Sequence, residues 1–276
     1  MSPTRTAESK RTDRFDVSSD DGTQIAVWVD GDGPPLVMVH GSLQDHTASG
    51  ALVEVLRGDL TTFAMDRRGF GASGDAPGYA LEREFEDVAA VVEAVAARTG
   101  GAVALWGHSY GASCAMGGAA LTRNVHQLVL YEPSLALTFP EGSLESLERK
   151  LAAGEKEVAL VEFLVEITGM TEAELQAMRT NPYMSWSERV ETVPMLVREC
   201  IAEEAWVYRP GQFDAIAAQT LLLAGSTSPP LLKEATRAAA EAIPGARVQV
   251  LEGEGHFAHR NDPAAVAAIV RQFLGS

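Results

Sequence analysis

The sequence predicts an α/β protein with a doubly wound, mostly parallel sheet of eight strands and an inserted helical lid. Three observations lead to this prediction. Short apolar runs such as LVMV, AVALW and LVLY recur along the chain, and Gly, Asp or Ser ends each of them. Helical patterns fill the intervals between these runs. One long interval contains helical patterns only, which indicates an insertion.

The apolar runs mark the strands. The expected strands are Arg14–Ser18, Gln24–Val29, Pro35–Val39, Thr61–Met65, Ala102–Trp106, Gln127–Tyr131, Thr220–Ala224 and Arg247–Leu251. From the third onward they are continuously hydrophobic, as expected of parallel strands that are covered on both faces. The first two are joined through Asp20-Asp21-Gly22, which predicts an antiparallel hairpin or meander.

The helical patterns divide into core and insertion. Core helices are expected over Leu81–Arg98, Pro229–Ile243 and Pro263–Leu274. Insertion helices are expected over Ser143–Ala153, Lys156–Thr168, Thr171–Arg179 and Ser187–Tyr208. We therefore predict a disordered arm over residues 1–12, a core over 13–133 and 219–276, and a lid over 134–218. The lid should cover the carboxyl edge of the sheet, where open α/β sheets bind ligands, although a packing elaboration is the alternative.

Composition narrows the classes of partner. The chain has 276 residues and a net charge of −16, which disfavours nucleic acid and anionic membranes as partners. Its two cysteines form no disulfide or zinc pattern, and Cys114 is expected to be a buried thiol. The polar start MSPTRTAESKRTDR lacks a signal peptide, and no apolar run approaches the ~20 residues that cross a bilayer. We expect a cytoplasmic protein without a metal or cofactor; its oligomeric state is not predicted.

The segment GHSYG is the strongest chemical signal. It matches G-x-S-x-G, follows the strand GAVALW and opens the small-residue helix ASCAMGGAAL. In this strand–turn–helix context the motif is a nucleophile elbow that exposes a serine at the top of the sheet, which predicts Ser109 as nucleophile. The N–H of Tyr110 faces the same site from a helix N-terminus, where the helix dipole favours negative charge.

Two further loops are expected at the same edge. The loop after Val39, sequence HGS, can supply a second backbone N–H from Ser42 to an oxyanion, while the His40 imidazole is expected to pack the loop. The loop GEGHF after the last strand carries His256, which can act as general base toward Ser109. His259 is the second candidate for the base, and chain order after the serine favours His256.

With these motifs in this order, the chain resembles the α/β-hydrolase superfamily with an inserted cap. HGS, DRRGFGASG, GHSYG and GEGHF carry the resemblance, which covers Asp16 to Leu274. It implies Ser109 as nucleophile, His256 as base, and oxyanion donors at Ser42 and Tyr110. One alternative motif is weak: GFGASG formally matches a dinucleotide loop, but Pro77 and Gly78 interrupt before the next helix.

The triad acid departs from the superfamily pattern. The usual position, in G-x-x-D after the seventh strand, holds Ser228, and no carboxylate lies between Asp214 and Glu234. Some members, including certain haloalkane dehalogenases and lactone hydrolases, carry the acid just after the sixth strand. There this chain has Glu132, which we predict to be the acid if it lies within hydrogen-bond reach of His256. Asp214 is a distant alternative, and a structural role for Glu132 remains open.

The expected activity follows from a serine nucleophile and an apolar lid. Serine chemistry indicates acyl transfer on a small to medium hydrophobic ester or lactone. C–C bond hydrolysis, perhydrolysis, a biosynthetic cyclisation and non-catalytic binding of a hydrophobic ligand are the alternatives. We expect two or three of the lid's methionines and aromatics to line the pocket, among Phe139, Phe163, Met170, Met178, Met184, Trp186, Met195, Trp206 and Tyr208.

Overall fold

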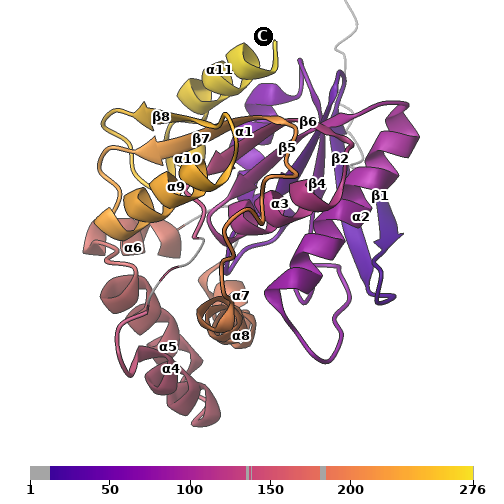
Figure 1. Cartoon of the computed structure of the whole chain (residues 1–276). Helices are drawn as coiled ribbons and strands as arrows, with labels where there is room; N and C mark the ends of the chain where they lie inside the picture. Colours follow the sequence, from indigo (N-terminus) through magenta and orange to yellow (C-terminus); the bar gives the residue numbers. More distant parts are fainter. Residues whose placement is uncertain (1–12, 135–136, 138, 181–184, 276) are drawn as a thin grey trace, which may run out of the picture.

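The core is an eight-stranded sheet whose strands follow the apolar runs of the sequence (Figure 1). A computed structural model describes residues 13–134, 137, 139–180 and 185–275, so the predicted arm over 1–12 lies outside the described residues. The strands are β1 (Asp13–Ser18), β2 (Gln24–Gly31), β3 (Pro35–Val39), β4 (Thr61–Met65), β5 (Val103–His108), β6 (Val125–Tyr131), β7 (Gln219–Gly225) and β8 (Arg247–Leu251). Every expected strand is confirmed, with small differences at the ends.

The strand order is β1-β2-β4-β3-β5-β6-β7-β8. The antiparallel pairs are β1 with β2 and β2 with β4, and all other neighbouring strands are parallel. This confirms the predicted antiparallel start and the parallel remainder. Strand β5 is buried along its whole length in the middle of the parallel part, so the residue that follows it emerges at the centre of the carboxyl edge.

Helices cover both faces of the sheet. The core helices are α1 (Gly50–Leu56), α2 (Leu81–Thr99), α3 (Tyr110–Leu121), α9 (Pro230–Ala242), α10 (Ala258–Asn261) and α11 (Pro263–Leu274), and the 3₁₀ turn η1 (His46–Ser49) precedes α1. Apolar side chains of α2, α3 and α9 share one buried cluster with the sheet. Those of α1, α10 and α11 form a second cluster on the opposite face.

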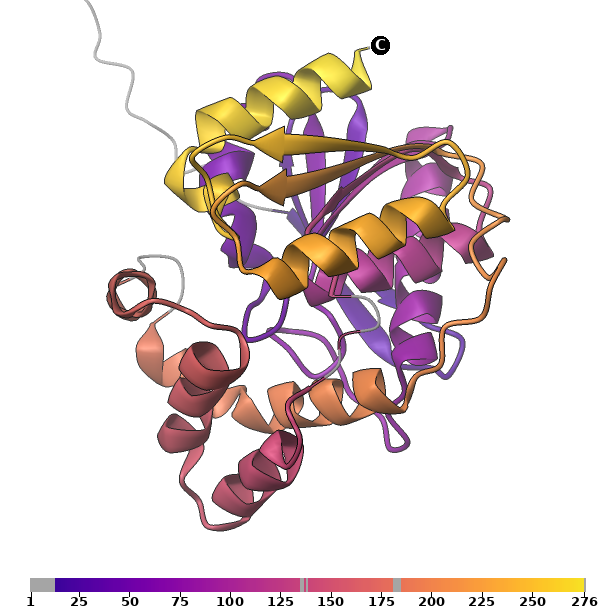
Figure 2. The same cartoon turned by 60° about the vertical axis from the view of Figure 1, so that its left-hand side comes forward.

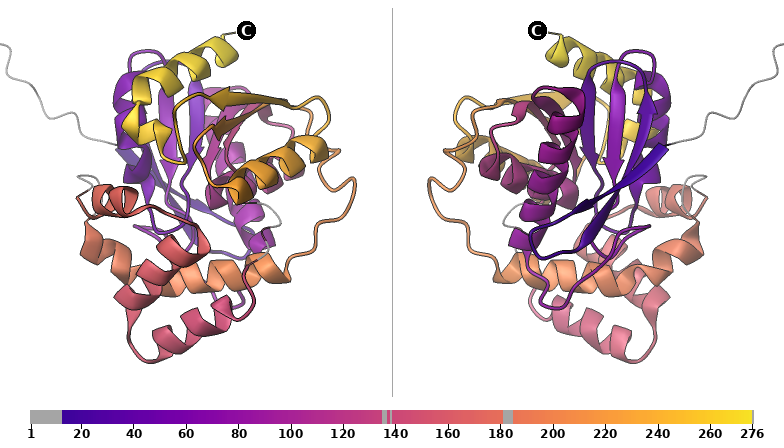
Figure 3. Two further views of the ribbon diagram at one scale, coloured as in Figure 1. Left: turned by 90° about the vertical axis from the view of Figure 1, so that its left-hand side faces the viewer. Right: turned by 90° about the vertical axis from the view of Figure 1, so that its right-hand side faces the viewer.

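The insertion between β6 and β7 is helical throughout its described regular elements. They are α4 (Ser143–Ala152), α5 (Lys156–Glu162), the π-helical turn η2 (Phe163–Ile167), α6 (Glu172–Arg179), α7 (Trp186–Glu191) and α8 (Val193–Ala205). These helices form a layer of their own below the sheet in the view of Figure 2, and the same separation is visible in both panels of Figure 3. They share a third apolar cluster, which includes Leu43 from the core loop after β3.

Two of the helical predictions need correction. The expected helix Lys156–Thr168 changes to π geometry at Phe163, and periodicity in a sequence does not reveal such a change. The expected helix Ser187–Tyr208 is divided at Thr192, because Pro194 lies in the first turn of α8 and proline is accepted there but not inside a helix. The short helices α1 and α10 were not predicted. Among the described residues, no helix is long and apolar enough to cross a membrane.

Candidate active site

Ser109 lies at a strained turn between β5 and α3. Its backbone has φ 57° and ψ −130°, a conformation that L residues rarely adopt. The Ser109 N–H donates to the Tyr131 carbonyl at 2.9 Å, while the Ser109 carbonyl accepts from Ala112 N–H at 2.8 Å. Strand and helix therefore fix the turn from both sides, which is the context that the G-x-S-x-G motif predicts.

Two glycines make this turn possible. A Cβ at Gly107 would lie 2.6 Å from Ala112 Cα, and a Cβ at Gly111 would lie 2.1 Å from the His40 carbonyl oxygen. Neither position has room for a side chain because the obstacles are mainly backbone atoms. The close approach at Gly111 also packs the first turn of α3 against the loop after β3.

Glu132 is the first residue after β6, and its side chain is fully buried. Its Oε2 lies 2.6 Å from His256 Nδ1, and its Oε1 accepts from Gly225 N–H at 2.7 Å. Its own N–H donates to the Leu223 carbonyl at 3.0 Å, so β7 holds both the backbone and the side chain. The carboxylate lies within the hydrogen-bond reach of His256 that the sequence prediction required.

The surroundings of Glu132 favour its ionised form. Burial alone would raise the pKa of Glu132, but the hydrogen bond and charge of His256 outweigh it, and the pKa lies below its ordinary value. The Ser228 hydroxyl and the Gly225 N–H make smaller contributions in the same direction. The Ser228 side chain is buried beside the carboxylate, and its N–H donates to the Gly225 carbonyl at 3.2 Å, which holds the hydroxyl close to Glu132.

Side chains of two sheet residues, Tyr131 and His108, hold the loop that carries His256 in place. The Tyr131 hydroxyl donates to the Gly255 carbonyl and accepts from Ala258 N–H at 3.2 Å. The His108 Nε2–H donates to the His256 carbonyl at 2.9 Å. Tyr131 and His108 therefore act as positioning residues on β6 and β5, roles that the sequence analysis did not assign.

The loop after β3 lies directly beside the elbow. A Cβ at Gly41 would lie 3.0 Å from Ser109 Cβ, and the next residue, Ser42, lines the same cavity as Ser109. The His40 ring is buried, donates from Nδ1 to the Gly41 carbonyl at 2.8 Å and accepts from Arg67 N–H at 3.0 Å. His40 therefore packs the loop, as predicted. Burial lowers its pKa to about 3, so the ring is neutral.

The remaining histidine candidate is in a different environment. The His259 side chain is fully buried, and neither ring nitrogen has a hydrogen-bond partner among the described residues. His256 lines the cavity with Ser109, whereas His259 does not. Asp214 is exposed and is likewise absent from the cavity lining. The geometry therefore favours His256 and Glu132 over both alternatives.

A cavity joins the strand ends to the insertion. Its empty volume is about 1020 Å³ when the open mouth is included. Ser42, Ser109, Tyr110 and His256 line it from the core side. Four of the expected lid side chains line it rather than two or three, namely Phe139, Phe163, Met170 and Met178. Met184 lies outside the described residues, and the other four candidates do not contribute.

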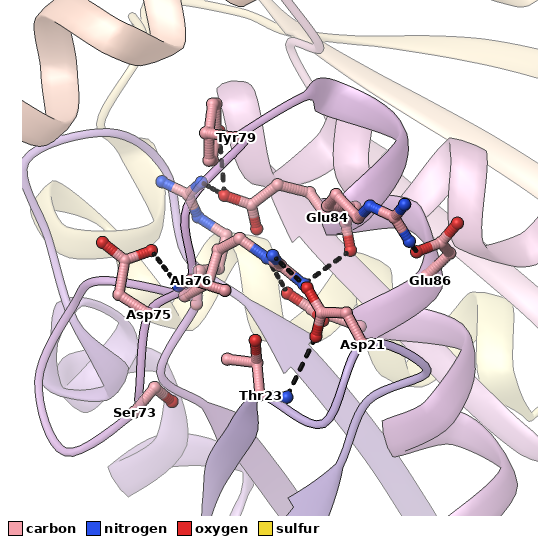
Figure 4. Close-up of polar contacts among 12 residues, drawn as sticks. Asp21, Thr23, Ser73, Asp75, Ala76, Tyr79, Glu84 and Glu86 are labelled. Atoms are coloured by element: carbon pink, nitrogen blue, oxygen red, sulfur yellow. Dashed lines mark hydrogen bonds and ion pairs between the residues drawn. The ribbon is translucent and has the colours of Figure 1, made fainter.

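Buried charges also reach this cavity. Glu199 and Glu203 on α8 line it, and Glu199 pairs with Arg67 at 2.5 Å. Arg67 also pairs with Glu84 at 2.8 Å, and Glu84 accepts from the Tyr79 hydroxyl at 3.0 Å (Figure 4). Burial raises the pKa of Glu203 to about 8, although a hydrogen bond from Ser134 opposes this shift. Sequence patterns gave no signal for these residues, because acidic residues on a helix are usually solvated.

The glycine-rich loop GFGASG has a structural explanation. It wraps around buried Asp66, which accepts hydrogen bonds from Ala72 N–H and Trp28 Nε1, each at 2.9 Å. A Cβ at Gly71 would lie 2.4 Å from the Asp66 carboxylate. No helix opens at these glycines, since α2 begins at Leu81. Within the described ranges, no group of three His, Cys, Asp or Glu side chains is arranged to hold a metal.

Comparisons with known proteins agree with this geometry. A family model described as "Alpha/beta hydrolase family" matches residues 36–269. An alpha/beta hydrolase from Sphaerobacter thermophilus DSM 20745 is 31% identical with a TM-score of 0.79, covering 94% of this chain and 100% of that one. An esterase from Rhodococcus sp. ECU1013 is 26% identical with a TM-score of 0.72, covering 95% and 98%. The enol-lactonase from Burkholderia xenovorans LB400 shares the fold at 18% identity and a TM-score of 0.68, covering 95% and 100%. No curated protein sequence matches the chain.

Proposed function

Since the chain belongs to the alpha/beta hydrolase family, we propose that it is a serine hydrolase that cleaves a small to medium carboxylic ester or lactone. One observation carries this proposal. The Glu132 carboxylate contacts His256 Nδ1 at 2.6 Å, and His256 lines one cavity together with Ser109. An acid, a base and a nucleophile that come together in this way suit acyl transfer.

In the first half of the reaction, Ser109 Oγ attacks the substrate carbonyl while His256 Nε2 accepts its proton. The tetrahedral intermediate places its oxyanion toward the N–H groups of Ser42 and Tyr110. Tyr110 begins helix α3, so its N–H is one of the first-turn donors that have no acceptor within the helix. Each such donor stabilises the transition state by about 3 kcal/mol. His256 then protonates the leaving alcohol, which departs and leaves an acyl-enzyme.

In the second half, His256 removes a proton from water, which attacks the acyl-enzyme. Collapse of the second tetrahedral intermediate releases the acid and returns the proton to Ser109. Glu132 holds His256 with Nδ1 protonated, so that Nε2 faces Ser109 as an acceptor, and its charge stabilises the imidazolium. A lowered pKa of Glu132 suits this role because the carboxylate stays ionised throughout.

The cavity supports a substrate with a hydrophobic body. Most of its lining is apolar, and the π-helical turn η2 alone contributes Phe163, Leu164 and Ile167. The inserted helices cover this space, and we propose that they act as a lid that shields the acyl-enzyme. The neighbour described as an esterase from Rhodococcus supports ester hydrolysis as the reaction of this chain.

The experiment is active-site labelling combined with turnover. We expect a fluorophosphonate probe to add to Ser109 in the intact protein, as read by mass spectrometry and peptide mapping, and we expect short-chain p-nitrophenyl esters to be hydrolysed. Ser109→Ala should lose both the label and the turnover, while Ser113→Ala, on the next turn of α3, should keep the label. Wild-type protein that shows neither label nor hydrolysis would refute the proposal.

A further inference from the structure

Arg189 is the one cavity-lining cation in the described part of the chain, and the triad does not use it. It lies on α7 of the insertion, and only 1% of its surface is exposed. A guanidinium so deeply buried normally pairs with a carboxylate, because an uncompensated buried charge is costly. Its position in the cavity of Ser109 therefore calls for an explanation.

The hydrogen bonding of Arg189 is incomplete. Its Nη1 donates to the Leu43 carbonyl at 2.7 Å, while Nε is buried without a partner. Among the described residues, no carboxylate lies within ion-pair distance of this guanidinium, although other buried arginines such as Arg67 and Arg68 each have two acidic partners. Arg189 Nε therefore keeps a buried donor that no described residue uses and that a carboxylate oxygen can accept from.

The negative charge that acts on Arg189, that of Asp45, compensates its burial only in part. Burial lowers the pKa of Arg189 to about 10, and the charge of Asp45 opposes this shift only in part. Arg260 lies near enough to be affected in its turn: burial and the charge of Arg189 lower the pKa of Arg260 to about 9. Both guanidinium groups remain charged at neutral pH, so Arg260, which does not itself line the cavity, adds positive charge close to Arg189.

Three acidic residues line the cavity, namely Glu174, Glu199 and Glu203. Glu174 is exposed to solvent, which screens its charge, and its carboxylate accepts from the N–H and the hydroxyl of Thr171 at the start of α6. Glu199 is neutralised by its contact with Arg67. The pKa of Glu203 is raised by burial to about 8, so its carboxyl is mostly protonated at pH 7. Because Glu203 is mostly neutral and Glu199 is paired, an anionic ligand in the cavity meets little repulsion from either.

We propose that Arg189 binds a carboxylate of the substrate, so that the enzyme acts on esters or lactones that carry a free carboxylate on a hydrophobic body. This inference rests on the proposed function for its catalytic step and adds the substrate class. The carboxylate accepts hydrogen bonds from Arg189 while the scissile carbonyl lies at Ser109. Arg189 then acts as a specificity determinant.

The competing explanation is that Arg189 only positions the oxyanion loop through Leu43. Leu43 adopts φ 60° beside Ser42, so loss of this contact could disturb the oxyanion donors. The two explanations differ in substrate dependence. A substrate anchor matters only for a carboxylated substrate, whereas a loop support matters equally for a neutral one.

The test compares two p-nitrophenyl esters of equal acyl length, the neutral pentanoate and the anionic monoester of glutarate. The kcat/KM of each is measured for wild type, Arg189→Gln and Arg189→Lys. Arg179→Gln is the matched control, since Arg179 lies in α6 of the same insertion and pairs with Glu157 outside the cavity. Wild type should prefer the glutarate ester. Arg189→Gln should lose about 30-fold or more on that ester, as expected when one partner of a buried charge pair is removed.

Arg189→Gln should lose at least about 10-fold more kcat/KM on the glutarate ester than on the pentanoate, because only the glutarate ester presents a carboxylate, and Arg189→Lys should retain part of the preference because it keeps the charge. Equal losses on both esters, or no preference in wild type, would overturn the inference and leave the serine hydrolase intact. A second measurement does not depend on turnover: glutarate, against sodium chloride of equal ionic strength, should raise the melting temperature of Ser109→Ala but not of Ser109→Ala with Arg189→Gln. If Ser109 is neither labelled nor active, the proposed function fails separately, and this melting shift still decides whether Arg189 binds a carboxylate.

Discussion

At the scale of single residues, the acid that contacts His256 can follow either of two neighbouring strands and still reach the same imidazole nitrogen. Strands β6 and β7 are parallel neighbours, and neighbouring strands lie about 4.8 Å apart. An acid at the end of either strand can therefore reach the same imidazole from the loop after β8. Glu132 does so with the help of Gly225 on β7, next to which buried Ser228 occupies the usual position of the acid.

Replacement of Glu132 tests this assignment. Glu132→Gln keeps an oxygen for Gly225 N–H, but its amide NH₂ cannot accept from His256 Nδ1–H. The imidazole is then held in the wrong tautomer, and we expect kcat to fall by about 10³- to 10⁴-fold. Steady-state kinetics on a short aryl ester measures this loss, while far-UV circular dichroism checks the fold.

Ser228→Ala is the control for the Glu132 substitution. The Ser228 hydroxyl assists Glu132 only as a minor contribution to its lowered pKa. We expect kcat of Ser228→Ala to stay within about 10-fold of wild type, because the ion pair remains intact. If Glu132→Gln behaved like Ser228→Ala, Glu132 would be a structural residue and not the triad acid.

The sequence predicts some site residues and not others for a physical reason. Ser109 and Glu132 follow directly after strands, and His256 lies in the loop after β8, so the ends of apolar runs locate all three at one edge of the sheet. Arg189 and Glu203 lie on amphipathic helices, where a charged residue normally faces solvent. Only the packing of the insertion against the core shows that these two charges point inward.

At the scale of secondary-structure elements, the sequence predicts strands best where helices cover both faces of the sheet. Each of the strands β3 to β7 contains an apolar run because helices cover both faces of the sheet, so composition alone locates them. Helix α1 was missed because GALVEVL is short, resembles a strand in composition and lacks a side-chain cap at its N-terminus. The π-helical turn η2 is invisible for a related reason, since one extra residue in a turn leaves no mark on the composition.

The packing of α3 on α2 gives a prediction at this scale. A Cβ at Gly117 would lie 2.1 Å from the Phe85 ring, which itself packs edge-on against Trp206. Gly117→Ala should therefore displace this aromatic pair and lower the free energy of unfolding by about 1–3 kcal/mol, despite the higher helix propensity of alanine. Urea denaturation measures the change.

Gly101→Ala is the matched control for this helix contact. Gly101 has an ordinary φ, and a Cβ there would meet no atom within 4 Å. We expect its free energy of unfolding to stay within about 0.5 kcal/mol of wild type. Equal behaviour of the two alanine variants would show that α2 can move away from α3 without cost.

At the scale of the whole molecule, buried titratable groups set how stability depends on pH. Burial lowers the pKa of His40 to about 3 and lowers the pKa values of His108 and His259 well below their ordinary range. Burial raises the pKa of Glu84 to about 7 and that of Glu203 to about 8. The two sets act in opposite directions, so their balance determines the pH of greatest stability.

The sign of each effect follows from proton binding. Below about pH 6.5 the unfolded chain protonates the three histidines and the folded protein does not, so stability falls as the pH falls. Above about pH 4.5 the unfolded chain ionises the two glutamates while the folded protein retains their protons, so stability falls as the pH rises. With three groups on one side and two on the other, the slopes cancel near about pH 6.5, where we expect the maximum.

Glu203→Gln shifts this maximum in a predictable direction. The variant keeps the shape of the side chain but removes one of the two groups that destabilise the protein as the pH rises. We expect the pH of greatest stability to move upward by about one unit, and the free energy of unfolding at pH 8 to rise by a few kcal/mol relative to wild type. The two proteins should converge toward about pH 4.5, where Glu203 is protonated in both the folded and the unfolded state. Urea denaturation from pH 5 to pH 8.5 gives both curves. A constant offset between them, with no change in the position of the maximum, would mean that Glu203 is ionised in the folded protein and that its replacement acts through packing alone.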